Sequence, residues 1–278
     1  MGTVSRGLDS QGYIEREGSL GRVGDAFRAA VAAARDRVAE TFGKRLDSAY
    51  LYGSVPRGAA RAGRSDLDLL LVLRAEPTPD DRADADAVAT AVDKEFTEVD
   101  GVGILLSSRA AVLSELETYD LGWFVACLCT PLLGEDLAEF LPRYRPDDLL
   151  ARETNGDLAL FLPRWRDRAA AAADDPEALR ALVRGASRHL VRTGFTLVMP
   201  RWGGWTSDLT EMAEVFARYY PQWADPMRAA AAMALEPAAD AAALREYTDV
   251  IGPWLAEEYT AVHGVKAPRP EQGWPGAH

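Results

Sequence analysis

Apolar residues in the first half of the chain change between helical and strand-like spacing. Over residues 23–42 they recur every three or four positions, which predicts one face of a helix. A short apolar run at 49–52 and a longer one at 66–73 predict buried strands. A second helix is predicted over about 80–97, and a third strand over 99–106. This alternation of helices and strands predicts a mixed α/β domain in which strands pack under helices.

The spacing of apolar residues changes after about residue 145. Before that point, 109–130 is predicted to be one helix ending near Thr130-Pro131, and 1–18 is predicted to be a loose arm. After it, no convincing strand is found, and Ala-rich stretches have helical spacing. These stretches are 151–173, 176–199, 207–219, 222–235 and 238–261. The predicted fold class is therefore α+β, with a mixed-sheet domain followed by a helical bundle.

Three segments follow from this division. They are a catalytic domain over 1–145, a helical bundle domain over 146–263 and a flexible tail over 264–278.

Composition narrows the classes of function. The chain has 278 residues, of which 48% are hydrophobic and 27% charged, as in globular proteins. Its net charge of −12 disfavours general nucleic-acid binding, which needs clustered Lys and Arg. The two cysteines, Cys127 and Cys129, form no disulfide framework. No apolar run is long enough to span a membrane and no signal peptide is seen, so a cytoplasmic protein is predicted.

The segment around Gly53-Ser54 has the features of a phosphate-binding turn. A strand is predicted to end there, and Pro56 suits the first turn of a helix that follows. Glycine lets a bulky anion approach the backbone, and serine offers a hydroxyl donor. The helix N-terminus adds free N–H groups and a partial positive charge. The turn is therefore a candidate seat for a phosphate group.

A pair of carboxylates follows on the next predicted strand. Asp66 and Asp68 are two residues apart, so on a strand their side chains point to the same face. Two carboxylates held together repel each other unless a divalent cation joins them. A phosphate seat beside such a pair is the apparatus of phosphoryl or nucleotidyl transfer.

These residues resemble a known family. Gly-Ser, a spacer and Asp-hydrophobic-Asp are similar to the signature of the DNA polymerase beta-like nucleotidyltransferase superfamily. The string GSVPRGAARAGRSDLDLLLVL is most similar to its small bacterial members, the aminoglycoside adenylyltransferases and the minimal nucleotidyltransferases. The resemblance covers residues 45–108. The second half is similar to the streptomycin/spectinomycin adenylyltransferases only in its arrangement as a helical domain.

The resemblance implies a role for each matching position. Two Mg²⁺ ions would be ligated by Asp66, Asp68 and a third carboxylate, for which Asp100 is the candidate and Glu98 the alternative. ATP would be bound through Gly53, Ser54, Arg57 and Arg64, and by Arg192 from the helical domain. The resemblance thus implies transfer of AMP from ATP to a hydroxyl of a small molecule, an aminoglycoside-like one among the options, as in antibiotic resistance.

Two alternatives stay open beside this hypothesis. One is an adenylyltransferase of antitoxin type that acts on a protein or RNA, and the other is an inactive nucleotide-binding protein. The sequence does not indicate the acceptor, the preferred base or the oligomeric state.

Other candidates are weaker. Arg184 and His189 resemble the RNase motif of HEPN domains, although such a pair on an Arg-rich helix arises often by chance. Cys127 and Cys129 lack further ligands nearby, which favours small buried side chains over a metal site. The segment 201–206 contains two tryptophans around a Gly pair, which fits either a loop that stacks on a ligand ring or aromatic packing on the bundle.

Overall fold

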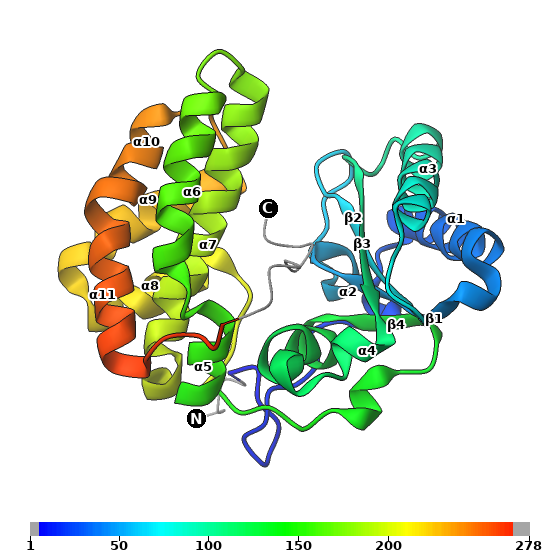
Figure 1. Cartoon of the computed structure of the whole chain (residues 1–278), viewed down its shortest axis with the longest axis horizontal. Coiled ribbons are helices and arrows are strands. Elements are labelled where there is room, and N and C mark those ends of the chain that lie inside the picture. Colours follow the sequence, from blue (N-terminus) through cyan, green and yellow to red (C-terminus); the bar gives the residue numbers. More distant parts are fainter. Residues whose placement is uncertain (1–5, 269–278) are drawn as a thin grey trace. The chain divides into compact units, whose positions relative to one another are not determined.

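The computed structural model describes residues 6–268. They form two compact units, each described here by itself. The sheet unit consists of residues 15–144, and the helical unit consists of residues 6–14 and 145–268. Figure 1 shows the strands in the first unit and the helices of the second in green to red.

The sheet unit is built on four strands in the order β3-β2-β1-β4. The central strands β1 and β2 are antiparallel, β4 is antiparallel to β1, and β3 is parallel to β2. The bounds are β1 (Leu46–Tyr52), β2 (Leu67–Leu73), β3 (Val102–Ser108) and β4 (Thr130–Gly134). The sheet is therefore mixed, and β3 and β4 are its edges.

Helices α1 (Asp25–Phe42) and α3 (Pro79–Glu95) cover the same face of this sheet (Figure 1). Their apolar positions form one core with Leu67, Leu69, Leu71 and Leu73 of β2. The helix α3 begins at Thr78, whose side chain accepts a hydrogen bond from the Asp81 amide in a capping box. The two helices predicted over 23–42 and about 80–97 and the three predicted strands are confirmed to within a few residues.

The segment between β3 and β4 differs from its prediction. Instead of one helix over 109–130, it forms α4 (Arg109–Val112), a 3₁₀ turn (Glu115–Glu117) and two π-helical turns (Thr118–Gly122 and Phe124–Leu128). The chain then enters β4, a strand that the sequence analysis missed. Proline, as at Pro131, is rare within strands because it has no backbone N–H to donate. The strand β4 lies at the edge of the sheet beside β1, and an edge strand tolerates proline because its outer side forms no ladder hydrogen bonds.

The helical unit contains no strand between residues 145 and 268, where every described element is helical. Its helices are α5 (Asp148–Asn155), α6 (Leu158–Ala171), α7 (Pro176–Trp202), α8 (Leu209–Tyr219), α9 (Ala224–Leu235), α10 (Ala241–Glu246) and α11 (Gly252–His263). The long helix α7 is the buried centre of the unit and packs against α8 and α9. The α+β fold class predicted from the sequence is confirmed.

Both ends of the described chain are held by the helical unit. The Trp205 amide donates a hydrogen bond to the Arg6 carbonyl (2.8 Å), and the Arg145 guanidinium lies 4.0 Å from the centre of the Tyr13 ring. Within the segment, Leu8 and Ile14 form an isolated antiparallel β-bridge. The prediction of a loose arm is therefore wrong for residues 6–14.

The predicted flexible tail begins with residues that also make contacts. Lys266 forms an ion pair with Asp157 (3.3 Å), in which both side chains are largely buried. The Lys266 amide donates to the Gly156 carbonyl. The rest of that segment, 269–278, lies outside the described residues. None of the helices in residues 6–268 has the length and apolar character needed to cross a membrane.

Candidate functional site

The turn after β1 has a backbone that only glycine adopts readily. Gly53 has φ +80° and ψ −151°, and it precedes the four-residue helix α2 (Ser54–Arg57). A side chain at this position would also meet the next strand, because an ideal Cβ on Gly53 would lie 2.7 Å from Oδ2 of Asp68. The strand–turn–helix predicted from Gly53-Ser54 is therefore present, and its glycine is in close contact with a candidate carboxylate.

Asp68 lies on β2, the strand between β1 and β3. Strand register places it opposite Tyr52 on β1 and opposite Gly103 on β3. An ideal Cβ on Gly103 would lie 3.1 Å from Oδ1 of Asp68. The two carboxylate oxygens thus face two glycines on the flanking chains, and each glycine leaves the room that an oxygen occupies.

Asp66 precedes the first residue of β2. Oδ1 of Asp66 lies 4.0 Å from an ideal Cβ on Gly101, whose φ is +111°. Both carboxyl side chains are half-buried, so they are accessible to a ligand at this end of the sheet. Asp66 therefore lies beside Gly101, and Asp68 lies beside Gly103.

Arg57 is held by the segment that precedes α1. Its guanidinium forms an ion pair with Glu17 (3.5 Å), and the Ser19 amide donates to the Pro56 carbonyl (3.0 Å). An ideal Cβ on Gly18 would lie 3.0 Å from Cβ of Pro56, so glycine permits this close approach. Contacts with the segment before α1 therefore hold the turn that carries Ser54 and Arg57 in place.

Arg64 lies in the loop between α2 and β2 and is exposed. Its amide donates to the Arg61 carbonyl (3.1 Å). Its phosphate-binding role stays a prediction.

The candidates for a third carboxylate lie just before β3. Asp100 is exposed and its amide donates to the Ser65 carbonyl (3.0 Å), while the Glu98 carbonyl accepts from the Gly63 amide (2.8 Å). Across residues 6–268, no group of three or more His, Cys, Asp or Glu side chains is placed to hold a metal ion. Asp66 and Asp68 stay the candidate ligands, and the third carboxylate stays a prediction.

The donor set nevertheless suits Mg²⁺. This ion is usually bound by one or two carboxylates together with the phosphates of a substrate and water. The two aspartates provide the carboxylates, and both side chains are half-buried. If Mg²⁺ is bound, Asp66 and Asp68 are the residues that would hold it.

The face of the sheet that carries Asp68 is bordered by the π-helical turns. Phe124 packs edge-on against Tyr52, with ring centres 5.1 Å apart. Cys127 and Cys129 lie at the end of this segment and are buried. Burial raises the pKa of both thiols, which keeps them protonated and unreactive. They are small buried side chains, as the sequence analysis favoured.

Of the weaker candidates on α7, His189 has a structural explanation, and a role for Arg184 stays a prediction. The ring of His189 packs edge-on against Phe161 (4.4 Å) and Trp165 (5.5 Å), and burial lowers its pKa to about 4. A neutral imidazole between aromatic rings is typical of packing. Arg192, one turn further on, is exposed, and its predicted role in nucleotide binding is untested by this geometry.

The two tryptophans of the segment 201–206 are buried. Trp202 and Trp205 pack edge-on against Phe195 at 5.7 and 5.6 Å and are 7% and 5% exposed. Their rings belong to the core of the helical unit, so the packing hypothesis fits and a platform for a ligand ring does not.

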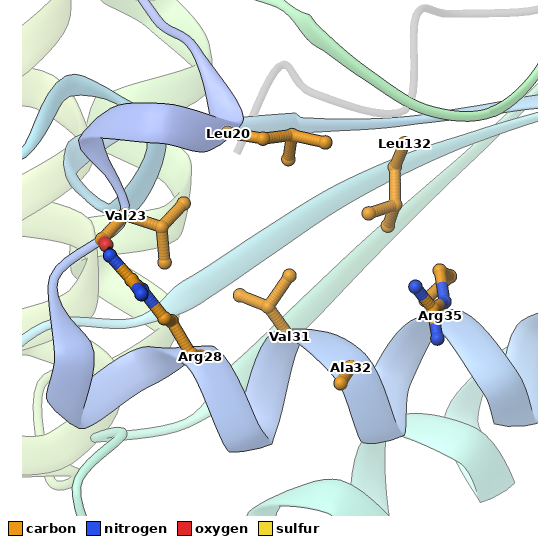
Figure 2. Close-up of a pocket in the computed structure, with 7 residues that line it drawn as sticks. All are labelled: Leu20, Val23, Arg28, Val31, Ala32, Arg35 and Leu132. Carbon is orange, nitrogen blue, oxygen red and sulfur yellow. The ribbon is translucent and has the colours of Figure 1, made fainter.

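A separate apolar cavity of about 180 Å³ lies in the sheet unit between α1 and β4 (Figure 2). It is lined by Leu20, Val23, Arg28, Val31, Ala32, Arg35 and Leu132. Its two arginines are paired with Asp25 and Asp36. None of the predicted site residues lines it, so it is distinct from the carboxylate pair.

Comparisons with known proteins were made by sequence and by structure. No protein-family model and no curated protein matches the chain. Seven chains of solved structures do. One is the spectinomycin adenyltransferase AAD(9) from Enterococcus faecialis, solved with ATP and spectinomycin. It is 13% identical, the TM-score is 0.49, and the match covers 84% of this chain and 98% of that chain. At this identity and TM-score the likeness assigns no residue role.

Proposed function

We propose that this protein is a Mg²⁺-dependent nucleotidyltransferase, which transfers AMP from ATP to a hydroxyl group of a small molecule. The main support is the contact between the phosphate-seat turn and the carboxylate pair. Oδ2 of Asp68 lies against Gly53, directly before Ser54, and Asp66 lies two residues from Asp68 on the same chain. A seat for phosphate and ligands for a cation are thereby adjacent, as transfer of a nucleotidyl group requires.

Each residue has a defined part in this proposal. The turn at Gly53 and Ser54 binds the β- and γ-phosphates, with the Ser54 hydroxyl as a donor. Arg57, which is paired with Glu17, neutralises phosphate charge, and Arg64 adds to this neutralisation. Asp66 and Asp68 hold Mg²⁺, which when bound supplies charge neutralisation and orientation to the triphosphate.

The reaction is a substitution at phosphorus. The acceptor hydroxyl oxygen forms a bond to the α-phosphorus, and the bond from this phosphorus to the bridging oxygen of the β-phosphate breaks. Pyrophosphate leaves with that electron pair, and the hydroxyl proton passes to a base, a role that the proposal gives to Asp100. Positioning and charge neutralisation provide most of the acceleration.

The net charge of −12 favours a cationic acceptor, of which an aminoglycoside is an example. A protein or RNA acceptor would give the same pyrophosphate release with a different mass shift. An acceptor screen with ATP, read by mass spectrometry for the addition of AMP, identifies which class is modified.

A second candidate is a nucleotide-binding protein without transferase activity. It is favoured by the finding that no group of three or more His, Cys, Asp or Glu side chains in residues 6–268 is placed to hold a metal ion. Pyrophosphate release that depends on an added acceptor distinguishes the two, because a binding protein releases none.

The test of the proposal uses one substitution and a matched control. Asp68→Asn removes a charge at the site and should lower acceptor-dependent pyrophosphate release by about two orders of magnitude or more, the scale of losing one preorganised electrostatic contact. Asp93→Asn makes the same chemical change on the exposed side of α3 and should leave the rate unchanged. Equal rates in both variants would contradict the proposal.

A further inference from the structure

The strand β3 lies at an edge of the sheet, and no other strand in residues 6–268 pairs with its outer side. Its sequence, VGILLSS, contains neither a charged residue nor a proline. Its register with β2 runs the whole length of the strand without a bulge. Proteins usually protect an exposed edge with charge, proline, a bulge or a covering segment, because an open edge pairs readily with another strand. The edge of β3 therefore has the features of a pairing surface.

The opposite edge of the sheet, at β4, is protected. Pro131 removes one backbone donor from it. The segment before α1 lies beside it, since an ideal Cβ on Gly18 would overlap the Thr130 hydroxyl. Further along the same segment, Leu20 lines one cavity together with Leu132 of β4. Within the described part of the chain, the two edges therefore differ, and β3 is the open one.

Backbone hydrogen bonds determine which residues of β3 face outward. The Leu67 amide of β2 donates to the Gly101 carbonyl (2.9 Å), while Leu67 itself is paired with Val102. Along a strand, the N–H and C=O of one residue point to one side and those of the next residue to the other. Gly101 and every second residue after it therefore direct their backbone groups to β2. The residues whose backbone groups point outward are Val102, Ile104, Leu106 and Ser108.

The hydrophobic core of the sheet unit extends to this edge. The side chains of Val102, Ile104 and Leu106 belong to the core that α1 and α3 cover. Leu106 is buried, whereas Val102 and Ile104 are only half-buried. A strand added beside β3 would cover these two side chains, and burial of apolar surface favours such an association.

We propose that β3 pairs with β3 of a second copy of this protein, antiparallel about a twofold axis at Leu105. In this register Ile104 lies opposite Leu106 of the second copy, and Val102 lies opposite Ser108 of the second copy. Every outward-facing residue thus meets another one, as an interface between two identical surfaces requires. The two four-stranded sheets become one continuous sheet. This inference does not depend on the proposed transferase activity.

The charges near the strand favour this register. A parallel pairing would bring the acids that precede β3, Glu98 and Asp100, next to the same acids of the second copy. In the antiparallel register each Asp100 lies five residues from Leu105, on opposite sides of the axis. The two Asp100 residues are then about 33 Å apart along the strands, well beyond the screening length of about 8 Å at physiological ionic strength. Because β3 itself has no charged residue, no like charges meet within the pairing.

The first experiment uses Leu105, which is half-buried and lies opposite itself in this register. Light scattering on the full-length protein should give the mass of two chains. Leu105→Lys and Leu105→Glu each place two like charges across the axis and should each weaken association by about tenfold or more. An equimolar mixture of the two variants should restore the dimer, because Lys then faces Glu. Leu20→Lys, at an exposed leucine beside the opposite edge, is the matched control and should stay dimeric.

The second experiment tests the register by cross-linking. In a non-hydrogen-bonded antiparallel pair the Cα atoms are about 4.5 Å apart, which a disulfide can span. Leu105→Cys should therefore form a covalent dimer when diamide is added as the oxidant. Ser107→Cys should not, because its two copies would be about 13 Å apart along the strands. The native Cys127 and Cys129 are buried, so they give little background.

Each outcome supports or contradicts the inference. A wild-type protein that is monomeric in light scattering overturns it, and so does a dimer that neither Leu105 variant weakens. If a charged variant fails to fold by circular dichroism, cross-linking decides, and equal cross-linking of Leu105→Cys and Ser107→Cys rules out the register. Acceptor-dependent pyrophosphate release is measured separately, so an active monomer sinks this inference alone and an inactive dimer sinks only the proposed function.

Discussion

Gly53→Ala is the change for which the structure gives the clearest magnitude. The backbone at Gly53, with φ +80° and ψ −151°, lies in a region that is essentially restricted to glycine. Alanine in such a conformation costs about 1–3 kcal/mol of folding free energy. The new methyl group would also lie 2.7 Å from Oδ2 of Asp68, about 0.7 Å closer than ordinary contact allows.

Movement of the carboxylate away from position 53 is limited, because Gly103 lies close on its other side. The carboxylate must rotate or the turn must shift, and either movement displaces a candidate metal ligand by several tenths of an ångström. Misplacement of a reacting group by about 1 Å can cost about 10²-fold in rate. We therefore expect Gly53→Ala to lower acceptor-dependent pyrophosphate release by one to two orders of magnitude while the protein still folds.

Gly63→Ala is the matched control in the same unit. Gly63 also has a positive φ, +70°, but nothing lies within 4 Å of its ideal Cβ. It should lose a similar stability, about 1–2 kcal/mol, and keep its activity. Urea denaturation followed by far-UV circular dichroism gives the stabilities, and a coupled pyrophosphate assay gives the rates. Equal rates in Gly53→Ala and Gly63→Ala would refute the contact between Gly53 and Asp68 as a functional one.

Three further predictions concern other parts of the molecule. Ser54→Ala should weaken ATP binding by about 10- to 100-fold, since a hydrogen bond to a charged group contributes about 1.5–3 kcal/mol, and unchanged affinity in calorimetry would mean that Ser54 is only a turn residue. Glu17→Gln should raise the KM for ATP severalfold with little change in kcat, because Glu17 braces Arg57, whereas Glu15→Gln, at an exposed position, should change neither. Burial lowers the pKa of His189 to about 4, below its ordinary 6.5, so the unfolded chain takes up this proton first and stability should fall as the pH falls from 6.5 towards 4. His189→Phe should reduce that pH dependence in urea unfolding at pH 7 and pH 5, and an identical loss in both proteins would contradict the assignment.

The parts of the fold that follow local rules were predictable from the sequence. The helix over 23–42 and the strand over 66–73 were identified because an apolar period of 3.6 or an apolar run marks burial directly. The strand β4 was missed because Pro131 and Gly134 oppose a strand locally. The segment forms a strand because it pairs with the open edge of β1, and no local sequence pattern indicates that pairing.

The candidate site divides in the same way. Gly53-Ser54 and the aspartates two residues apart are local motifs, so the sequence alone indicated them. The role of Gly103 depends on the register between β2 and β3, which joins residues far apart in the chain. The proximity of Gly101 and Gly103 to two carboxylates became visible only with this register.

The attachment of residues 6–14 to the helical unit determines how this protein can be dissected. A gene fragment that starts at residue 145 encodes every helix of that unit but omits the segment whose Arg6 carbonyl accepts the Trp205 amide. Expressed alone, such a fragment should be less stable than the same unit in the full chain. A synthetic peptide spanning 6–14 should restore the stability of the fragment in trans, as in fragment complementation. The order of residues along the chain alone would not indicate that this N-terminal segment belongs to the helical unit.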